Sequence, residues 1–184
     1  MKKTDVINLI QISDCHLGSK KDFLSNGVNT YDSFKKVLCE IKKKFGSSLI
    51  IISGDISASG AKTSYQLFSD TMDKEGLPYR WIPGNHDDLQ LMSNIISQQF
   101  IRVEKHDNWV IISLISCDSK NVEGFLAKNE IEELEFLLKK YKDLYILLFV
   151  HHPPASINSK WLDEHRITNS GKLETILSGH PNVK

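Results

Sequence analysis

The sequence lacks any long apolar run, and this absence excludes one class of protein. A membrane-spanning helix needs about 20 consecutive apolar residues, and no stretch approaches that length. At the N-terminus, MKKTDVINLIQIS places two lysines before apolar residues, as a signal peptide does. Asp5, Asn8 and Gln11 interrupt those apolar residues, so no continuous hydrophobic region forms. We therefore expect neither a signal peptide nor a membrane anchor.

The sequence also lacks a charge excess and has few cysteines. Lys and Arg number 23, and so do Asp and Glu, giving a formal net charge of zero. This balance argues against a protein that coats DNA or a membrane surface, and it makes nucleic acid an unfavoured partner. The three cysteines, Cys15, Cys39 and Cys117, are odd in number and widely spaced. They predict reduced thiols in a cytoplasmic protein.

The chain is nevertheless long enough to fold on its own. Its 184 residues, 40% of them hydrophobic, predict one soluble globular domain over residues 1–184, with two small domains as the less favoured alternative. A chain of this length buries roughly 70% of the surface that it exposes when unfolded. It therefore needs neither a disulfide nor a structural metal for stability.

Apolar, β-branched runs alternate with helical patterns along the chain. Strands are predicted at 6–13, 48–53, 79–82 and 144–150, with two more within 100–116 joined by a turn at 106–108. Helices are predicted at 30–46, 62–75, 88–98, 128–142 and 169–178. This alternation indicates a layered α/β domain with a mostly parallel or mixed sheet.

Four of the predicted strands end in polar residues of the same kinds. The residues are Asp14 and His16, Asp55, Asn85 and His86, and finally His151 and His152. In an open α/β sheet, ligands bind beyond the carboxyl ends of the strands. Four strands that bring Asp, Asn and His to that edge predict a metal site.

Local geometry favours the same interpretation. In an extended segment, residues two apart point the same way, so Asp14 and His16 are expected to reach one centre while Cys15 packs on the other side as a buried thiol. Gly54 and Gly84 each precede a ligand candidate, where glycine permits a sharp turn.

Each motif has a simpler reading when it is taken alone. Gly, Asn and Asp are common turn residues, and the prolines after His152 can simply end a strand. Asp87 and Asp88 are expected to orient neighbouring groups or to cap a helix. Together, the carboxylate, amide and imidazole groups suit Mn, Fe or Zn, and they allow a pair of divalent ions that acts on phosphoryl groups.

In this order, D-x-H, G-D, G-N-H-D and H-H-P-P resemble the motifs of the calcineurin-like metallophosphoesterases. The stretches LIQISDCHLG, CDS (117–119) and LSGHPNVK are most similar to the bacterial cyclic-AMP-phosphodiesterase-like branch, known as class III. The resemblance covers nearly the whole chain. It implies an α-β-β-α sandwich with mixed sheets and two divalent metal ions.

The resemblance also implies a role for each candidate residue. Asp14 and His16 would bind the first metal, Asn85 and His151 would bind the second, and Asp55 would bridge both. His86 would act beside the scissile phosphate. The residues that would support the site or the substrate are His152, Asp87, Gly54 and Gly84.

The end of the chain departs from the family pattern. The family closes its site with G-H-x-H, whereas Gly179-His180-Pro181-Asn182 has no second histidine and matches the run upstream of that motif. We read His180 as a surface or helix-end residue, and we expect the domain to be truncated before the final motif. A missing strand would expose a sheet edge, through which a homodimer could form.

Three functions remain open at this stage. The first is a two-metal phosphoesterase that acts on a small, cyclic-nucleotide-like phosphodiester through a metal-activated hydroxide. The second is a catalytically inactive, truncated scaffold or binding protein of the same fold. The third, a nuclease, is less favoured because no basic groove is evident.

Some residues outside the motifs are expected to be structural. His106 and His165 fall in polar surface segments. The tryptophans are predicted to pack in the core or in a lid rather than to stack on a substrate. Trp161 and Asp163 are expected to border the pocket.

Overall fold

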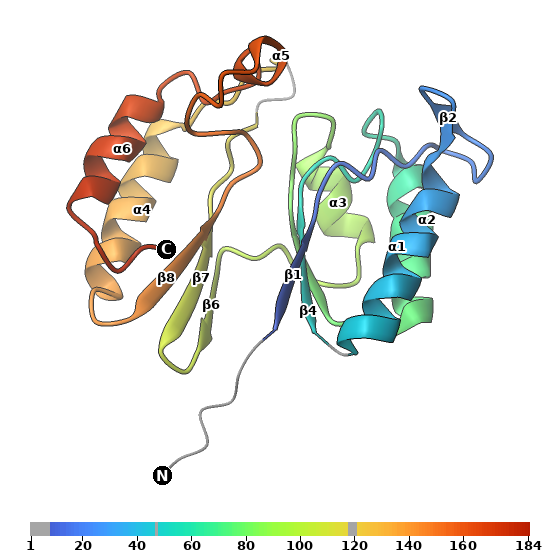
Figure 1. Ribbon diagram of the computed structural model, residues 1–184, viewed down its shortest axis with the longest axis horizontal. Helices are drawn as coiled ribbons and strands as arrows, with labels where there is room; N and C mark the ends of the chain where they lie inside the picture. The colour runs from blue at the N-terminus through green and yellow to red at the C-terminus, as the bar shows by residue number, and fades with distance from the viewer. Residues whose placement is uncertain (1–7, 47, 118–120) are drawn as a thin grey trace. The chain divides into compact units, whose positions relative to one another are not determined.

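The computed structural model describes residues 8–46, 48–117 and 121–184, which divide into two compact units (Figure 1). Unit 1 comprises Met1–Trp81 and His86–Phe100, and unit 2 comprises Ile82–Asn85 and Ile101–Lys184. Parts of two predicted features, the start of the first strand at 6–7 and the CDS motif at 118–119, lie outside the described residues. The single-domain assignment stays a prediction.

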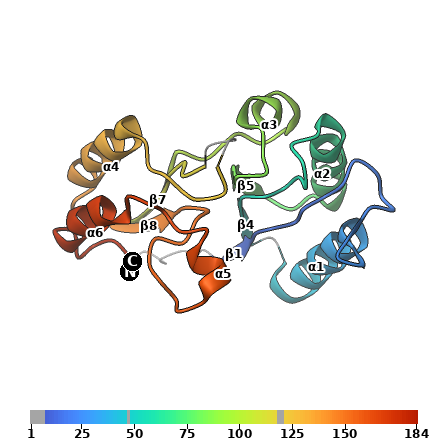
Figure 2. The ribbon, with the colours of Figure 1, turned by 90° about the horizontal axis from the view of Figure 1, so that it is seen from above.

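Unit 1 is a three-stranded sheet covered by helices. Its strands, in spatial order, are β1 (Leu9–Ile12), β4 (Leu49–Ser53) and β5 (Tyr79–Ile82), and β1 runs parallel to β4. Its helices are α1 (Thr30–Phe45), α2 (Lys62–Glu75) and α3 (Leu89–Ile95). The short strands β2 (Leu24–Ser25) and β3 (Val28–Asn29) form a separate hairpin. Figures 1 and 2 show α1 and α2 side by side on one face of the sheet.

The core of unit 1 follows from the sequence pattern. Helix α1 begins after Asn29, whose side-chain oxygen accepts a hydrogen bond from the Asp32 backbone N–H at 2.9 Å. It buries Phe34 and other apolar residues against the sheet. The ring of Phe34 stacks on Phe68 of α2, with 5.6 Å between centroids. Trp81 of β5 is fully buried in the same core, as predicted.

Unit 2 is a mixed sheet packed against helices. Its strands are β6 (Val103–His106), β7 (Trp109–Ser113) and β8 (Tyr145–Phe149), with β6 antiparallel and β8 parallel to β7. Its helices are α4 (Lys128–Lys140), α5 (Lys160–Asp163) and α6 (Ser170–Ser178). Helices α4 and α6 lie side by side and share a core with β7 and β8 (Figures 1 and 2).

The last residues of the chain pair with β8. The Ile146 backbone N–H donates to the Asn182 carbonyl at 2.9 Å, and the Lys184 N–H donates to the Ile146 carbonyl at 2.8 Å. Part of the β8 edge is therefore covered by the chain itself. His180 follows helix α6, in agreement with its predicted helix-end position.

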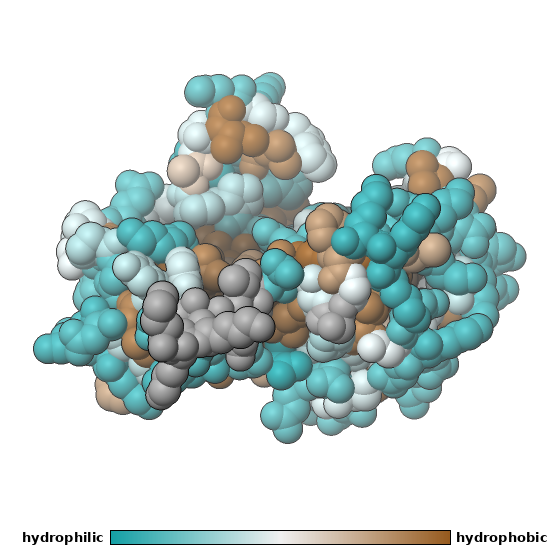
Figure 3. Space-filling view, turned by 60° about the horizontal axis from the view of Figure 1, so that its bottom comes forward, coloured by the Kyte–Doolittle hydropathy of each residue, from teal (hydrophilic) through white to brown (hydrophobic). Residues whose placement is uncertain are grey.

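The predicted α/β class with mixed sheets is confirmed. The helix predicted at 88–98 is shorter than expected, since α3 ends at Ile95. The β2–β3 hairpin and α5 were not predicted. Within the described part of the chain, no helix is both long and apolar enough to cross a bilayer. On the face that Figure 3 shows, hydrophilic residues predominate and hydrophobic residues emerge in scattered patches.

Candidate metal centre

In unit 1, the segments that follow β1 and β4 remain paired beyond the ends of the strands. The Asp14 N–H donates to the Gly54 carbonyl at 3.1 Å, and the His16 N–H donates to the Asp55 carbonyl at 2.9 Å. A further bridge joins Leu17 to Ser57. Hydrogen bonds between backbone groups therefore bring Asp14, His16 and Asp55 together.

The side chains of this part converge on one point. Donor atoms of His16, Asp55 and His86 all lie within 4.8 Å of one another. His16 Nε2 lies 3.6 Å from Asp14 Oδ1 and 3.6 Å from Asp55 Oδ2. The rings of His16 and His86 meet edge to face, with 4.8 Å between centroids. Because a zinc-like ion lies about 2.0–2.2 Å from nitrogen and oxygen ligands, a small shift would let these atoms share one ion.

The backbone reaches this arrangement through strained conformations. Asp14, His16 and Asp55 have φ angles of 57°, 42° and 53°, in the left-handed region that residues with a Cβ rarely adopt. Each such residue costs on the order of 1–3 kcal/mol, and such residues gather at functional sites. The predicted extended conformation of this segment is therefore wrong, although Asp14 and His16 do converge.

The two predicted turn glycines differ. Gly54 has a φ of 103°, a conformation that favours glycine strongly. Gly84 is not among the residues with positive φ in the described part of the chain. The expectation that glycine is needed for a sharp turn is therefore supported at Gly54 but not at Gly84.

Negative charge accumulates in this part of unit 1. The hydrogen bond that the His16 ring donates to the Asp14 carboxylate is the largest cause that raises the pKa of His16, and Asp55 adds to it, while burial opposes them. Burial, followed by Asp87, raises the pKa of the Cys15 thiol to about 12. Cys15 is therefore a neutral thiol near neutral pH, as predicted for a packed cysteine, and the carboxylates form an environment suited to a cation.

Asp87 is buried and connects the turn after β5 to the segment after β4. Its carboxylate accepts hydrogen bonds from the backbone N–H groups of Ile56 at 3.1 Å and Ser57 at 3.0 Å, and from the Tyr65 hydroxyl at 3.2 Å. The neighbouring Asp88 caps α3 by accepting from the Leu91 N–H at 2.9 Å. Both acids thus act as orienting or capping groups. Tyr65, 22 residues from Asp87, was not identified from the sequence.

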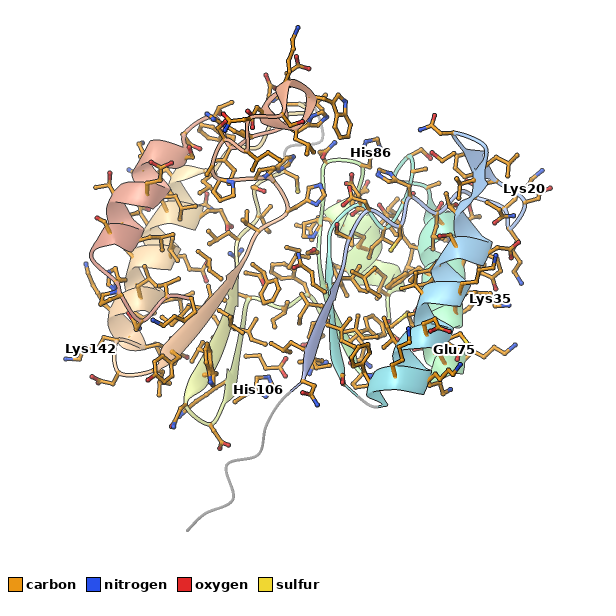
Figure 4. All side chains as sticks on the ribbon, in the orientation of Figure 1. Lys20, Lys35, Glu75, His86, His106 and Lys142 are labelled. Atoms are coloured by element: carbon orange, nitrogen blue, oxygen red, sulfur yellow. The ribbon has the colours of Figure 1, made fainter. Side chains whose placement is uncertain are left out.

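His86 lies at the end of unit 1 where β1 and β4 finish (Figure 4). Its backbone N–H donates to Asp55 Oδ1 at 3.0 Å. Its ring Nδ1 lies 3.0 Å from the Ala58 carbonyl oxygen. A carbonyl can only accept, so Nδ1 carries the proton and Nε2 has the lone pair in the neutral ring. Ala58 could not be identified from the sequence, because it contributes only a backbone oxygen.

Unit 2 holds a second group of predicted ligands. His151 Nε2 lies 3.3 Å from Asn85 Oδ1, a distance compatible with two atoms that share an ion. His152 is 2% exposed, and its Nδ1 lies 2.8 Å from the Ser116 hydroxyl oxygen. The rings of His151 and His152 are in contact, with 4.9 Å between centroids. Ser116 was not identified from the sequence, where it is an ordinary strand-end serine.

Gly124 explains how His152 is held. A Cβ at this position would lie 2.6 Å from the His152 Cβ, so only glycine fits without a shift. The backbone of Gly124 also pairs with Arg166 and Thr168. His152 is therefore held between Ser116 and a close backbone segment.

The structure thus gathers the predicted site residues into two groups. Asp14, His16, Asp55, His86 and Asp87 lie in unit 1, and Asn85, His151 and His152 lie in unit 2. Asn85 and His86 are consecutive in the chain, so one peptide bond joins the groups. The fold and these donors define a class: an α/β protein that carries the ligand types of a divalent-metal site.

Comparison with known proteins identifies the family. The family model described as calcineurin-like phosphoesterase matches residues 7–181, and the chain belongs to this family. The resemblance inferred from the motifs is thereby confirmed.

Curated relatives match over almost the whole chain. The 3',5'-cyclic adenosine monophosphate phosphodiesterase CpdA of Escherichia coli (strain K12) is 32% identical over 183 residues, which cover 97% of this chain. The 3',5'-cyclic-nucleotide phosphodiesterase alr5338 of Nostoc is 30% identical over 182 residues, covering 97% of this chain and 68% of the relative. The chain spans 66% of the length of the E. coli relative.

Solved structures support the fold alone. A dimetal phosphatase from Danio rerio matches with a TM-score of 0.72 at 11% identity, covering 97% of this chain and 79% of the other. A purple acid phosphatase from yellow lupin, PPD1, matches with a TM-score of 0.65 at 13% identity, covering 95% of this chain and 36% of the other.

Proposed function

We propose that this chain is a two-metal phosphoesterase that hydrolyses phosphodiesters, with nucleoside 3',5'-cyclic monophosphates as the substrate class. The observation that carries the proposal is the convergence of His16, Asp55 and His86, whose donor atoms lie within 4.8 Å of one another. The substrate class is supported by relatives that are cyclic-nucleotide phosphodiesterases by name.

The residues fit a pair of divalent ions. We assign Asp14, His16 and Asp55 to one ion, and Asn85 and His151 to the other. Imidazole nitrogen with carboxylate and amide oxygen suits Mn, Fe or Zn. When bound, such ions lower the pKa of water and neutralise charge on phosphoryl oxygens.

His86 is the proposed proton-transfer group. The Ala58 carbonyl fixes its tautomer, and the hydrogen bond from its backbone to Asp55 fixes its position. In the protonated ring, Nε2–H can donate to the leaving oxygen of the substrate. A positioned acid of this kind contributes about 10²- to 10⁴-fold in rate.

The remaining site residues are proposed to position the ligands. Asp87 holds the segment that follows Asp55 through two backbone N–H groups. His152 supports His151 by ring contact. Gly54 supplies the left-handed turn before Asp55. Gly84 is kept in this supporting group because it immediately precedes Asn85.

The test uses the metal-stripped chain reloaded with Mn. Turnover of bis-p-nitrophenyl phosphate and of 3',5'-cyclic AMP is measured together with bound metal. Asp55→Asn is expected to lose most of the metal and the activity. His86→Ala is expected to keep the metal while its rate falls about 10²- to 10⁴-fold. Asp70→Asn and His180→Ala are matched controls, since neither residue belongs to the proposed site.

Each alternative has its own outcome. Wild-type turnover in both site variants would show that the site is misassigned. Loss of metal in His86→Ala would make His86 a ligand, which its position beside His16 and Asp55 allows. No turnover by a folded, metal-loaded chain would favour the inactive scaffold. We also propose a cytoplasmic location and a homodimer formed through a sheet edge. Analytical sedimentation, which measures the oligomeric state, tests the homodimer.

A further inference from the structure

The segment 153–167 in unit 2 carries an exposed tryptophan. We call this segment the Trp161 loop; it starts directly after His152 and contains helix α5. Trp161 is 66% exposed, whereas Trp109 is 38% exposed and Trp81 is fully buried. The sequence predicted packing for all three tryptophans. Trp161 instead presents most of its indole to solvent.

The Trp161 loop is held in place by its own hydrogen bonds. The Asp163 carboxylate accepts from the Ser156 hydroxyl at 2.7 Å and from the Ile157 N–H at 3.0 Å. At the base of the loop, the Ile167 N–H donates to the Pro153 carbonyl at 3.0 Å. The exposed indole is therefore carried by an ordered segment.

Contacts with Gly124 and His165 also hold the loop and the indole in place. The Gly124 N–H donates to the Arg166 carbonyl at 3.0 Å, and the same glycine packs closely on His152. The His165 ring lies against the Trp161 indole, with 4.9 Å between centroids at 54°. His165 Nδ1 donates to the Trp161 carbonyl at 2.8 Å. One part of the Trp161 indole therefore packs on His165, and the rest is exposed to solvent.

The loop lies at the end of unit 2 that carries the ligand His151. Figure 1 shows α5 at the end of unit 2 where β8 finishes, and His151 follows β8 in the chain. The Trp161 loop and His152 also share a support in Gly124, which hydrogen-bonds to Arg166 of the loop and packs on His152.

We propose that Trp161 is a specificity-determining residue that stacks on the planar ring of the phosphodiester substrate, a nucleobase in a nucleotide. This inference rests on the proposed function. An indole face stacks on any base, because every base has a π-face. A platform that is ordered before binding loses little conformational freedom when the ring arrives.

The kinetic test compares two phosphodiesters in the metal-loaded chain. 3',5'-Cyclic AMP carries a planar base, and glycerophosphoethanolamine carries no planar ring. Trp161→Ala is expected to raise KM for cyclic AMP about 5- to 150-fold, the equivalent of about 1–3 kcal/mol of base stacking. We expect kcat to be unchanged, KM for glycerophosphoethanolamine to be unchanged, and Trp161→Phe to restore part of the loss. Trp109→Ala is the matched control. An equal change for both substrates, or none, would overturn the inference.

A binding test does not depend on turnover. Adenosine 5'-monophosphate is added to the metal-free chain while tryptophan fluorescence is recorded. We expect quenching that Trp161→Phe removes and Trp109→Phe retains. Quenching that persists in Trp161→Phe, or no quenching at all, would contradict the inference. Failure to hydrolyse either diester, with this quenching intact, would instead refute the proposed function.

Discussion

Asp87→Asn tests whether a buried acid positions the proposed metal ligands. The substitution keeps the size of the side chain and removes its charge. One carboxylate oxygen accepts from the Ile56 N–H, and the other accepts from the Ser57 N–H and the Tyr65 hydroxyl. An amide can offer an oxygen to only one of these sides. Its NH₂ group must then face a backbone N–H, which is also a donor.

The cost can be worked from these bonds. A buried donor left unpaired costs about 1–3 kcal/mol, and hydrogen bonds to a charged acceptor are stronger than neutral ones. Asp87 is only 7% exposed, so water does not replace the lost partner. We expect a total loss of about 2–4 kcal/mol in the free energy of unfolding. That is a large part of the 5–15 kcal/mol that is typical of a native protein.

Urea unfolding followed by tryptophan fluorescence measures this loss, with Trp81 reporting from the same unit. We expect the midpoint to fall by about 1 M or more, since m is roughly 1–3 kcal/mol per M. Asp88→Asn is the matched control, because Asn caps a helix as well as Asp does. Metal affinity should fall only in Asp87→Asn, as Ile56 and Ser57 directly follow Asp55. Equal midpoints for the two variants would refute the reasoning.

Two further predictions concern unit 2. Gly124→Ala forces a methyl group to within 2.6 Å of His152. We expect this to destabilise the protein by about 1–3 kcal/mol, measured as a lower Tm. Gly171→Ala is the control, because its methyl group meets no atom within 4 Å and should not lower the Tm. The hydrogen bond from the Ser156 hydroxyl, then that from the Ile157 N–H, holds the pKa of Asp163 below its ordinary 3.8. The stabilisation of the Trp161 loop by the ionised Asp163 carboxylate is complete above pH 3.8 and is lost as pH falls through the lowered pKa. Acrylamide quenching of Trp161 should therefore increase only in strong acid, and Asp163→Asn should remove that change; a transition near neutral pH would contradict this.

The sequence was sufficient to place the candidate residues at the ends of strands. Apolar runs that stop at Asp14, Asp55 and Asn85 mark where buried strands end, because burial is what the pattern records. The parallel pairing of β1 and β4 then brings the first two of these residues together. The family motifs agreed with this placement.

The sequence could not predict what depends on conformation or on distant partners. The left-handed φ angles of Asp14 and His16 leave no trace in hydrophobic periodicity, so an extended segment was the natural expectation. Strands β2 and β3 have two residues each, too few for alternation to be seen. Asp87 pairs with Ile56 across 31 positions, and no local pattern reveals such a bond.

The backbone pairing that continues past β1 and β4 positions the ligand segments through groups other than the side chains proposed to bind the metal. Asp14, His16 and Asp55 are held in place by backbone groups that every residue other than proline possesses. A single substitution at Asp14 or His16 can therefore weaken metal binding and leave the backbone pairing of these segments in place. In evolutionary terms, such a frame can lose one activity and acquire another through point changes, since this backbone pairing is made by groups other than the side chains proposed to bind the metal.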